Sequence, residues 1–389
     1  MVQNSKSKII ALAIGFLVLL PSPEIITSSG AYALGALSLA VISMSIYNLR
    51  QIKLIDIIFI IVSIIVVFVS LLANSERYEV LILARELFKV VFYLILIFGL
   101  VECFRRILSS EDVELFDRVL KSLVIIQVFY IIASYTDGGR ELLSIFYDLS
   151  KLSPGLNIFS DRVRYVGSFD NPNYLGLFIV LYIGYLLSAK SLKKVDYLML
   201  FLCMLIIIAT GSRTAILATS VLFMTKYFWS MKFLIFLSFF GFAFYSDIIE
   251  IISEIPRLSI LLSTEEATSS ESLGTRILLI DEALVLIEKS LFVGYFDSPI
   301  QITDNYFTLF ALRYGLLGCV VALFVLITLL IRVRRHIEYS SLAYMLSPLL
   351  VFLVTGSFVD NPRMFGVISL LLVMANTRAF KINSMEKQI

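Results

Sequence analysis

Arginines in short polar stretches are the residues of this sequence best suited to chemistry. Arg213 ends the stretch "TGSR", Arg276 ends "GTR", and Arg162 and Arg164 belong to "RVRY". A guanidinium keeps its charge when partly desolvated and donates in a planar fork that fits two phosphate oxygens. These arginines are therefore candidates for binding an anionic ligand. The alternative that the sequence leaves open is an ordinary preference for pairing with lipid phosphates.

Two further polar stretches nearly repeat each other. "GSFDNPN" covers 167–173 and "GSFVDNPR" covers 356–363, and each lies beside a long apolar run. Asn or Asp before Pro is typical of a helix start, because the side chain accepts amides of the first turn while Pro pre-sets the backbone. We expect the second copy, with Asp360, mainly to cap a helix. The first copy has arginines nearby, so it is also expected to contribute to a site.

The elements that must position these residues are predicted to be membrane-spanning helices. The chain has 389 residues, of which 59% are hydrophobic and 16% charged, and its mean hydropathy is +0.94. No run shows the two-residue alternation of a barrel strand, so we predict an all-α polytopic membrane protein of about twelve spans, or eleven. The apolar runs are 9–20, 31–47, 54–72, 86–104, 119–135, 174–188, 197–210, 214–229, 231–246, 305–331, 341–355 and 364–379.

The distribution of Lys and Arg predicts the orientation. With the N- and C-termini in the cytoplasm, every short cytoplasmic loop carries at least two basic residues, as the positive-inside rule expects. Residues 1–389 then form one integral-membrane domain with two long outer loops, 136–173 and 247–304. The first run is also compatible with a cleavable signal sequence.

Both outer loops are too polar to span and are predicted to contain short helices at the membrane interface. The first begins with a short helix and then approaches 167–173 in an extended conformation. In the second, an amphipathic helix follows Arg276. Its polar face is expected to hold Asp281, Glu282, Val285, Glu288 and Lys289.

Three more basic residues lie within an apolar run or directly before one. Arg313 falls about two turns into the run 305–331, and a charge in a span needs a partner, so it is a functional candidate or half of a structural ion pair. Arg85 and Lys89 are four residues apart, which places them on one helix face near the outer surface. They are candidates for the border of the same site.

No metal or disulfide chemistry is indicated. The three cysteines, Cys103, Cys203 and Cys319, fall inside or at the ends of apolar runs, where a thiol packs as a small apolar group. The one histidine, His336, belongs to the basic loop "RVRRHIEY". We therefore expect no metal ion and no cofactor.

The order of motifs resembles a known family. "GSFDNPNYLG", "TGSRTAILA", a long loop with "TRILLIDEAL" and "SLFVGYF", and then "DNYFTLFALRYGLLG" cover about 167–318. Together they are similar to the O-antigen polymerase (Wzy type) and O-antigen ligase superfamily of the bacterial inner membrane. The resemblance implies a metal-independent glycosyltransferase that joins undecaprenyl-pyrophosphate-linked oligosaccharide repeat units on the outer, periplasmic face and releases undecaprenyl pyrophosphate. The ligase branch has a histidine where this chain has Asp304, which favours the polymerase branch.

The resemblance also implies roles for the candidate residues. Guanidiniums stabilise the charge that builds up on the departing pyrophosphate, with Arg213 and Arg276 first and Arg164 and Arg313 next. A carboxylate, Asp304 or Asp170, orients or deprotonates the acceptor hydroxyl. The substrate-binding set is completed by Arg162, Asn171, Asn173, Asn305, Arg85 and Lys89.

Other functions remain open at this stage. An O-antigen ligase-like glycan transferase fits the same layout, and a lipid-linked sugar transporter or flippase also has about twelve spans, although it usually shows repeats and a site at the midplane. The expected partners are the lipid-linked oligosaccharide, the bilayer and a protein that regulates chain length. No nucleic acid is expected.

Overall fold

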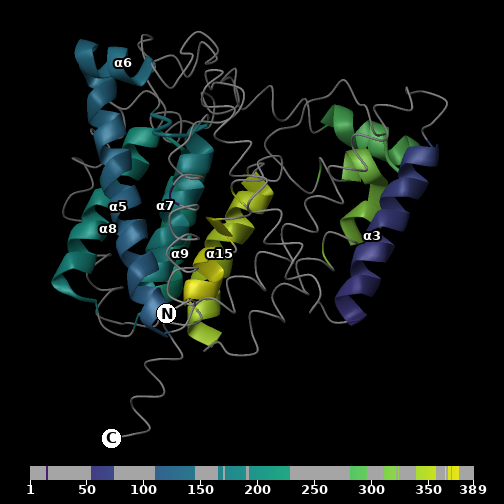
Figure 1. Cartoon of the computed structure of the whole chain (residues 1–389). Coiled ribbons are helices and arrows are strands. Elements are labelled where there is room, and N and C mark those ends of the chain that lie inside the picture. The colour runs from purple at the N-terminus through teal and green to yellow at the C-terminus, as the bar shows by residue number, and fades with distance from the viewer. Residues whose placement is uncertain are drawn as a thin grey trace, which may run out of the picture.

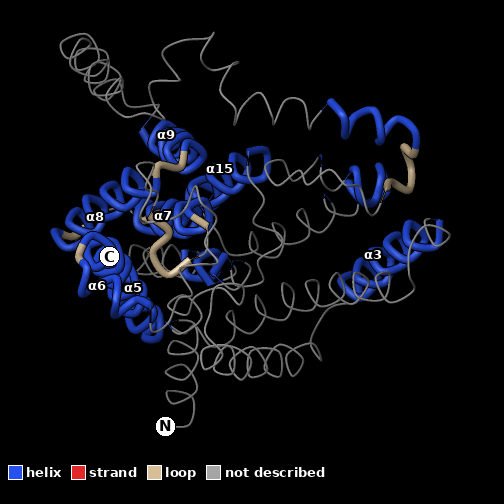
Figure 2. The backbone as a smooth tube through the Cα atoms, turned by 90° about the horizontal axis from the view of Figure 1, so that it is seen from above, coloured by secondary structure: helices blue, strands red, loops and turns tan. Residues whose placement is uncertain are grey.

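The computed structural model describes part of the chain. The described residues are 15, 54–73, 110–144, 165–169, 171–189, 192–227, 281–295, 308, 311–320, 323, 339–355, 364, 367, 368 and 370–375. Regular structure in these residues is helical throughout, which confirms the all-α prediction for this part of the chain (Figures 1 and 2). Counting only the described residues, no helix is both long enough and apolar enough to cross a membrane.

Apart from α6, the helices lie over the apolar runs; α3 begins where its run begins, and the others begin before theirs. They are α3 (Leu54–Ala73), α5 (Ser110–Tyr135), α6 (Asp137–Ser144), α7 (Pro172–Leu187), α8 (Lys194–Thr210), α9 (Arg213–Tyr227) and α15 (Tyr339–Thr355). The largest difference is at α5, which begins at Ser110 although its apolar run begins at 119. α6 is the short helix predicted at the start of 136–173.

α7 is the central helix of a bundle. It packs against α8, α9 and α15, while α5 packs against α8 and α6. Figure 2 shows α7 enclosed by these neighbours. Every residue of α7 except Asn173 and Tyr174 is buried. A helix that is apolar all round is buried all round, which is why α7 is the core of the bundle.

α7 and α15 approach closely at a glycine. A Cβ placed on Gly184 would lie 2.6 Å from the carbonyl oxygen of Tyr344. Pro348 lies four residues after Tyr344 inside α15, and proline has no amide hydrogen to donate to that carbonyl. The absence of a side chain at Gly184 therefore lets α7 and α15 approach closely beside Pro348.

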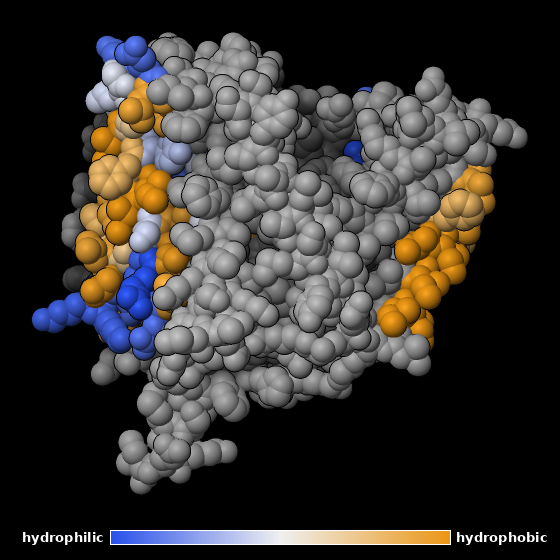
Figure 3. Space-filling model, in the orientation of Figure 1, coloured by the Kyte–Doolittle hydropathy of each residue, from blue (hydrophilic) through white to orange (hydrophobic). Residues whose placement is uncertain are grey.

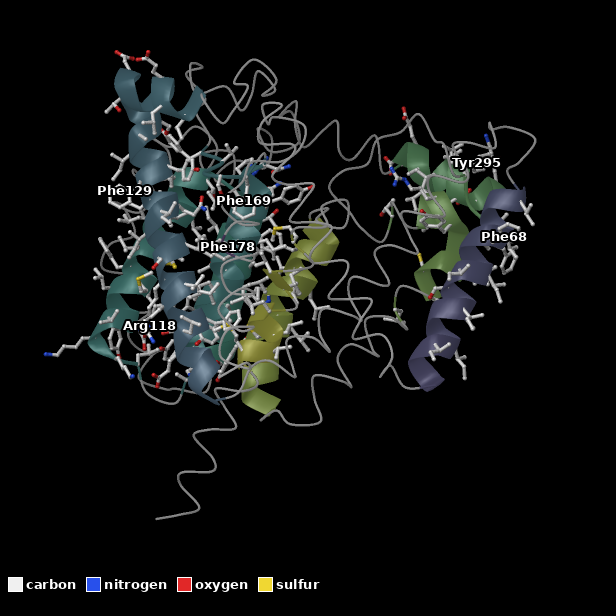
Figure 4. The ribbon with its side chains drawn as sticks, in the orientation of Figure 1. Phe68, Arg118, Phe129, Phe169, Phe178 and Tyr295 are labelled. Atoms are coloured by element: carbon white, nitrogen blue, oxygen red, sulfur yellow. The ribbon has the colours of Figure 1, made fainter. Side chains whose placement is uncertain are left out.

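A second packed unit is formed by 281–295 and 311–320. Ala283, Ile287 and Leu312 make its small apolar core. The predicted polar face of the amphipathic helix is confirmed, because its members are all exposed: Asp281, Glu282, Val285, Glu288 and Lys289. Figure 4 labels Tyr295, which packs against this core.

The two segments of this unit are joined by their main chains. The Tyr295 amide donates to the Leu312 carbonyl (2.5 Å), and the Leu316 amide donates to the Leu291 carbonyl (2.8 Å). In a regular helix the Leu316 amide would instead reach back four residues to Leu312.

Two glycines permit this joint. Gly294 and Gly315 have φ of 71° and 64°, a left-handed conformation that residues with a Cβ rarely adopt. A Cβ on Gly294 would also lie 2.5 Å from the Gly315 nitrogen. The run 305–331 was predicted as one continuous helix. Its described residues 311–320 are helical throughout, as predicted; what was not predicted is the left-handed φ of Gly315 within this helix, where the partner segment approaches.

Large apolar side chains are exposed along several helices. Figure 3 shows them over α3 and over the side of the bundle formed by α5 and α8. In Figure 4, Phe68 of α3 and Phe129 of α5 point away from their helices, whereas Phe169 and Phe178 lie in the bundle interior. The exposed set on α3 includes Ile57, Ile61, Ile65, Phe68 and Leu72, and that on α8 includes Tyr197, Leu198, Phe201, Leu205 and Ile208.

Candidate site at the upper end of the bundle

The upper end of the bundle, uppermost in Figure 1, is where α7 and α9 begin and where α5 and α8 end. The first part of this end is the start of α7. The Asn171 side-chain oxygen accepts the Asn173 amide at 2.8 Å, and Pro172 is the first helical residue. The cap predicted from the Asn-Pro pair is confirmed for Asn171. The Asn171 side chain, predicted as part of the substrate-binding set, thus has a structural role through its oxygen.

The second part is the turn between α8 and α9. Gly211 ends α8 with φ 56°, and the Ser212 hydroxyl oxygen accepts the Ala215 amide at 3.3 Å, so Ser212 caps α9. Arg213 is then the first residue of α9. Its side chain is half-buried, and its terminal nitrogen Nη1 is buried. The tight Gly-Ser turn predicted before this arginine is therefore present.

A hydrogen bond joins these two helix starts. The Ser212 hydroxyl donates to the side-chain oxygen of Asn173 at 2.7 Å, across 39 residues of sequence. Nearby, the Tyr165 amide donates to the Ala209 carbonyl at 3.3 Å. The motifs "GSFDNPN" and "TGSR" are thus brought together, with Arg213 beside the start of α7.

The third part was missed by sequence reasoning. Gln127 of α5 is 0% exposed, and its side-chain amide nitrogen donates to the Ser168 hydroxyl at 2.8 Å. Its side-chain oxygen accepts the Ser168 amide at 2.9 Å. Ser168 and Phe169 are also fully buried, and Phe169 packs against Phe178 with 6.0 Å between ring centroids. A single glutamine in an apolar run has no spacing pattern, so its position gave no signal.

The described residues contain part of the predicted site. Asn171, Asn173 and Arg213 lie together at the upper end. Arg313 belongs to the separate unit 281–295 and 311–320, where its side chain is half-buried. The remaining candidates lie outside the described residues: Arg276, Asp304, Asp170, Arg164, Arg162, Asn305, Arg85 and Lys89, together with the second repeat at 356–363.

Helix dipoles do not set the electrostatics of this end. α7 and α9 present their positive N-termini there, but α5 and α8 present negative C-termini, so the contributions largely cancel. Among the described residues, the charged side chains at this end include the carboxylates of Asp137 and Glu141 on α6 and the guanidinium of Arg213. Arg213 lies in the first turn of α9, and the cap residue Ser212 fixes the backbone of that turn.

The lower end of the bundle is held by charges, of which Asp196 is fully buried and Lys121 and Asp117 are partly exposed. The Lys121 ammonium of α5 contacts Asp117 at 2.8 Å and Asp196 of α8 at 3.0 Å, and Asp196 is 0% exposed. Asp196 also accepts the Lys193 amide at 3.1 Å and so caps α8. Arg118, which is labelled in Figure 4, lies at this end. Among the described residues, no group of three or more His, Cys, Asp or Glu side chains has a metal-binding arrangement.

Comparison of the chain with models of protein families gave no match, and comparison with curated proteins gave none either.

Proposed function

We propose that the protein is a polymerase of lipid-linked oligosaccharides in the bacterial inner membrane. It joins repeat units carried on undecaprenyl pyrophosphate, at the membrane face where α7 and α9 begin. The acceptor is the non-reducing sugar of one lipid-linked unit, and the donor is the growing chain on another. The proposal rests on the order of sequence motifs and on the upper end of the bundle, where two of those motifs meet.

The proposed reaction is a glycosyl transfer. A hydroxyl oxygen of the acceptor sugar forms a bond to the anomeric carbon of the donor, and the bond from that carbon to the pyrophosphate oxygen breaks. The hydroxyl proton passes to a carboxylate, for which Asp304 and Asp170 are the candidates. Negative charge grows on the leaving pyrophosphate, so a fixed guanidinium nearby lowers the barrier.

The observation that carries the proposal is the hydrogen bond from Ser212 to Asn173. It connects "TGSR" to "GSFDNPN", two stretches that the resemblance assigns to one site. It also places Arg213, which can bind two phosphate oxygens at once, at a helix start rather than along a helix face. The buried Nη1 atom of Arg213 supports a guanidinium that is partly removed from water, where its interaction with an anion is stronger.

Two observations support the membrane location. The sequence is 59% hydrophobic, and the described parts of α3, α5 and α8 expose large aliphatic and aromatic side chains. A soluble protein rarely exposes apolar patches of this extent, because each buried square ångström of apolar surface is worth about 25 cal/mol. Contact with lipid acyl chains would remove these side chains from water.

The direct test is reconstitution. Purified protein in vesicles is incubated with the lipid-linked repeat unit extracted from the source bacterium, and the products are separated by length. A ladder of polymers on the lipid carrier is the expected result. Transfer of a single unit to another acceptor would indicate the ligase-like alternative, and movement of the unit across the bilayer without a new bond would indicate a flippase.

A second test addresses Arg213. Arg213→Ala is expected to reduce polymer formation below detection while the protein remains folded in the membrane. Arg213→Lys should restore little activity, because an ammonium cannot bind two oxygens in a fork. Full activity in Arg213→Ala would remove this residue from the proposed site. The matched control is Lys226→Met at the other end of α9, where the Lys226 ammonium donates to the Leu187 carbonyl at 2.8 Å.

A further inference from the structure

Gln127 occupies an unusual position in α5. It is a polar side chain with 0% exposure in the middle of an apolar helix. A buried amide without partners would cost several kcal/mol, so its hydrogen bonds decide whether it is tolerated. Both its nitrogen and its oxygen bond to one residue, Ser168, at 2.8 and 2.9 Å.

The backbone around Ser168 is shaped to receive this side chain. A Cβ on Gly167 would overlap the Gln127 side-chain oxygen, so a residue larger than glycine would displace the amide. After Ser168, the Phe169 amide closes a turn onto the Val166 carbonyl at 2.9 Å. Four residues, Tyr165, Val166, Ser168 and Phe169, are buried together in this segment.

Further contacts lead from the start of α7 to Arg213. Asn171 lies two residues after Phe169 in the sequence, and its side-chain oxygen accepts the Asn173 amide. Asn173 accepts the hydroxyl of Ser212, and Ser212 holds the first turn of α9. Three helices, α5, α7 and α9, are therefore linked at the upper end by neutral side chains.

We propose that Gln127 is a positioning residue of the anion-binding site. Through the turn at Ser168 it fixes the segment 165–173, and through Asn173 and Ser212 that segment fixes the start of α9 and the Arg213 guanidinium. Gln127 itself contacts neither substrate nor pyrophosphate. This inference rests on the proposed function, since that function makes Arg213 a ligand of pyrophosphate.

The test needs variants that distinguish a change in the position of segment 165–173 from a general loss of protein stability. Gln127→Leu removes both hydrogen bonds and keeps a side chain of similar size. Gln127→Glu keeps the oxygen that accepts the Ser168 amide and serves as the conservative variant. Val124→Ala is the matched control, because Val124 is fully buried in the same helix and its truncation lowers stability but removes neither hydrogen bond between Gln127 and Ser168.

The first measurement is amide hydrogen exchange of the peptide covering 165–173 in detergent-purified protein. We expect exchange in Gln127→Leu to be at least about tenfold faster than in wild type, with smaller changes in Gln127→Glu and Val124→Ala. Unchanged exchange in Gln127→Leu would overturn the positioning role, whatever the protein's activity is.

The second measurement is calorimetric binding of inorganic pyrophosphate. Wild type and Val124→Ala should bind equally, Gln127→Leu about tenfold more weakly, and Gln127→Glu in between, because a displaced guanidinium loses its fork geometry. Equal binding by wild type and Gln127→Leu would overturn the inference. Equal binding by wild type and Arg213→Ala would instead contradict the proposed function, and the exchange data would still decide the role of Gln127 in the fold.

Discussion

The two ends of the helix bundle are held together by different chemistry. At the lower end, α5 meets α8 through the charges of Lys121, Asp117 and Asp196. At the upper end, α5 meets the segment before α7 through Gln127 and Ser168, and α7 meets α9 through Asn173 and Ser212. These upper-end bonds all join neutral groups.

This difference suggests separate roles for the two ends: the lower end stabilises the fold, and the upper end binds a ligand. Buried ions stabilise a structure only when their partners are present, so the lower-end charges depend on one another. Neutral hydrogen bonds hold the upper end without a formal charge. Arg213 follows Ser212 directly, beside these neutral hydrogen bonds. We therefore expect substitutions at the lower end to change stability and those at the upper end to change activity.

The largest effect on stability is expected for Lys121→Met. It leaves Asp196, which is 0% exposed, without its cation, and removal of one partner of a buried pair typically costs about 3–5 kcal/mol. Thermal unfolding in detergent measures the loss. Polymer formation per folded molecule should remain close to wild type. Lost activity at unchanged stability would reverse the assignment of the two ends.

A smaller loss is expected where α7 packs on α15. Gly184→Ala places a methyl group 2.6 Å from the Tyr344 carbonyl oxygen, and overpacking of this kind costs about 1–3 kcal/mol. The matched control is Gly138→Ala in α6, because no atom lies within 4 Å of a Cβ at that position. The control should be neutral or slightly more stable. Equal unfolding temperatures for both variants would show that the α7–α15 contact is looser than described.

At the upper end, Ser212→Ala should cost about 1 kcal/mol of stability, as a lost helix cap does. It also removes the hydroxyl that bonds to Asn173, so the polymer yield should fall much more than the stability. Ser220→Ala is the control on the same helix, since the Ser220 hydroxyl bonds only to the Ile216 carbonyl of α9 in the hydrogen bonds described. A full polymer yield in Ser212→Ala would remove the link between α7 and α9 from the proposed site.

The smallest effect on stability is expected for two exposed cysteine substitutions, which test which end faces outward. The substitutions are Leu142→Cys and Lys194→Cys. Leu142 lies in α6 at the upper end, Lys194 lies at the start of α8 at the lower end, and both residues are exposed. In intact cells, a membrane-impermeant thiol reagent should label Leu142→Cys but not Lys194→Cys. Wild type serves as the blank for its native cysteines. Labelling of Lys194→Cys in intact cells would exclude the proposed orientation.

The helix cores were predictable because long apolar runs mark them directly. α3 was predicted at 54–72 and observed at Leu54–Ala73. The start of α5 was not predictable in this way. Hydropathy detects where a helix is apolar, and Ser110–Arg118 continues the same helix with polar residues. The cap at Asn171 was predictable because an Asx-Pro pair has a local physical role.

The parts that escaped prediction depend on contacts between distant residues. Gln127 is recognisable only once Ser168 lies against it, 41 residues later in the sequence. The left-handed turn at Gly315 likewise depends on the segment that ends at Tyr295. A signal did exist for the second case, because "FVGYF" and "RYGLLG" each place a glycine among bulky residues. Its meaning required the knowledge that the two glycines meet.

The joint between 281–295 and 311–320 has a consequence for how this region tolerates change. Its two bonds run from main chain to main chain, so the bonds themselves do not depend on the identity of the exposed side chains around them. What the joint does fix is the count of residues between the bonded groups, from Leu291 to Tyr295 on one side and from Leu312 to Leu316 on the other. Insertion or deletion of a single residue within either interval would move a glycine out of register.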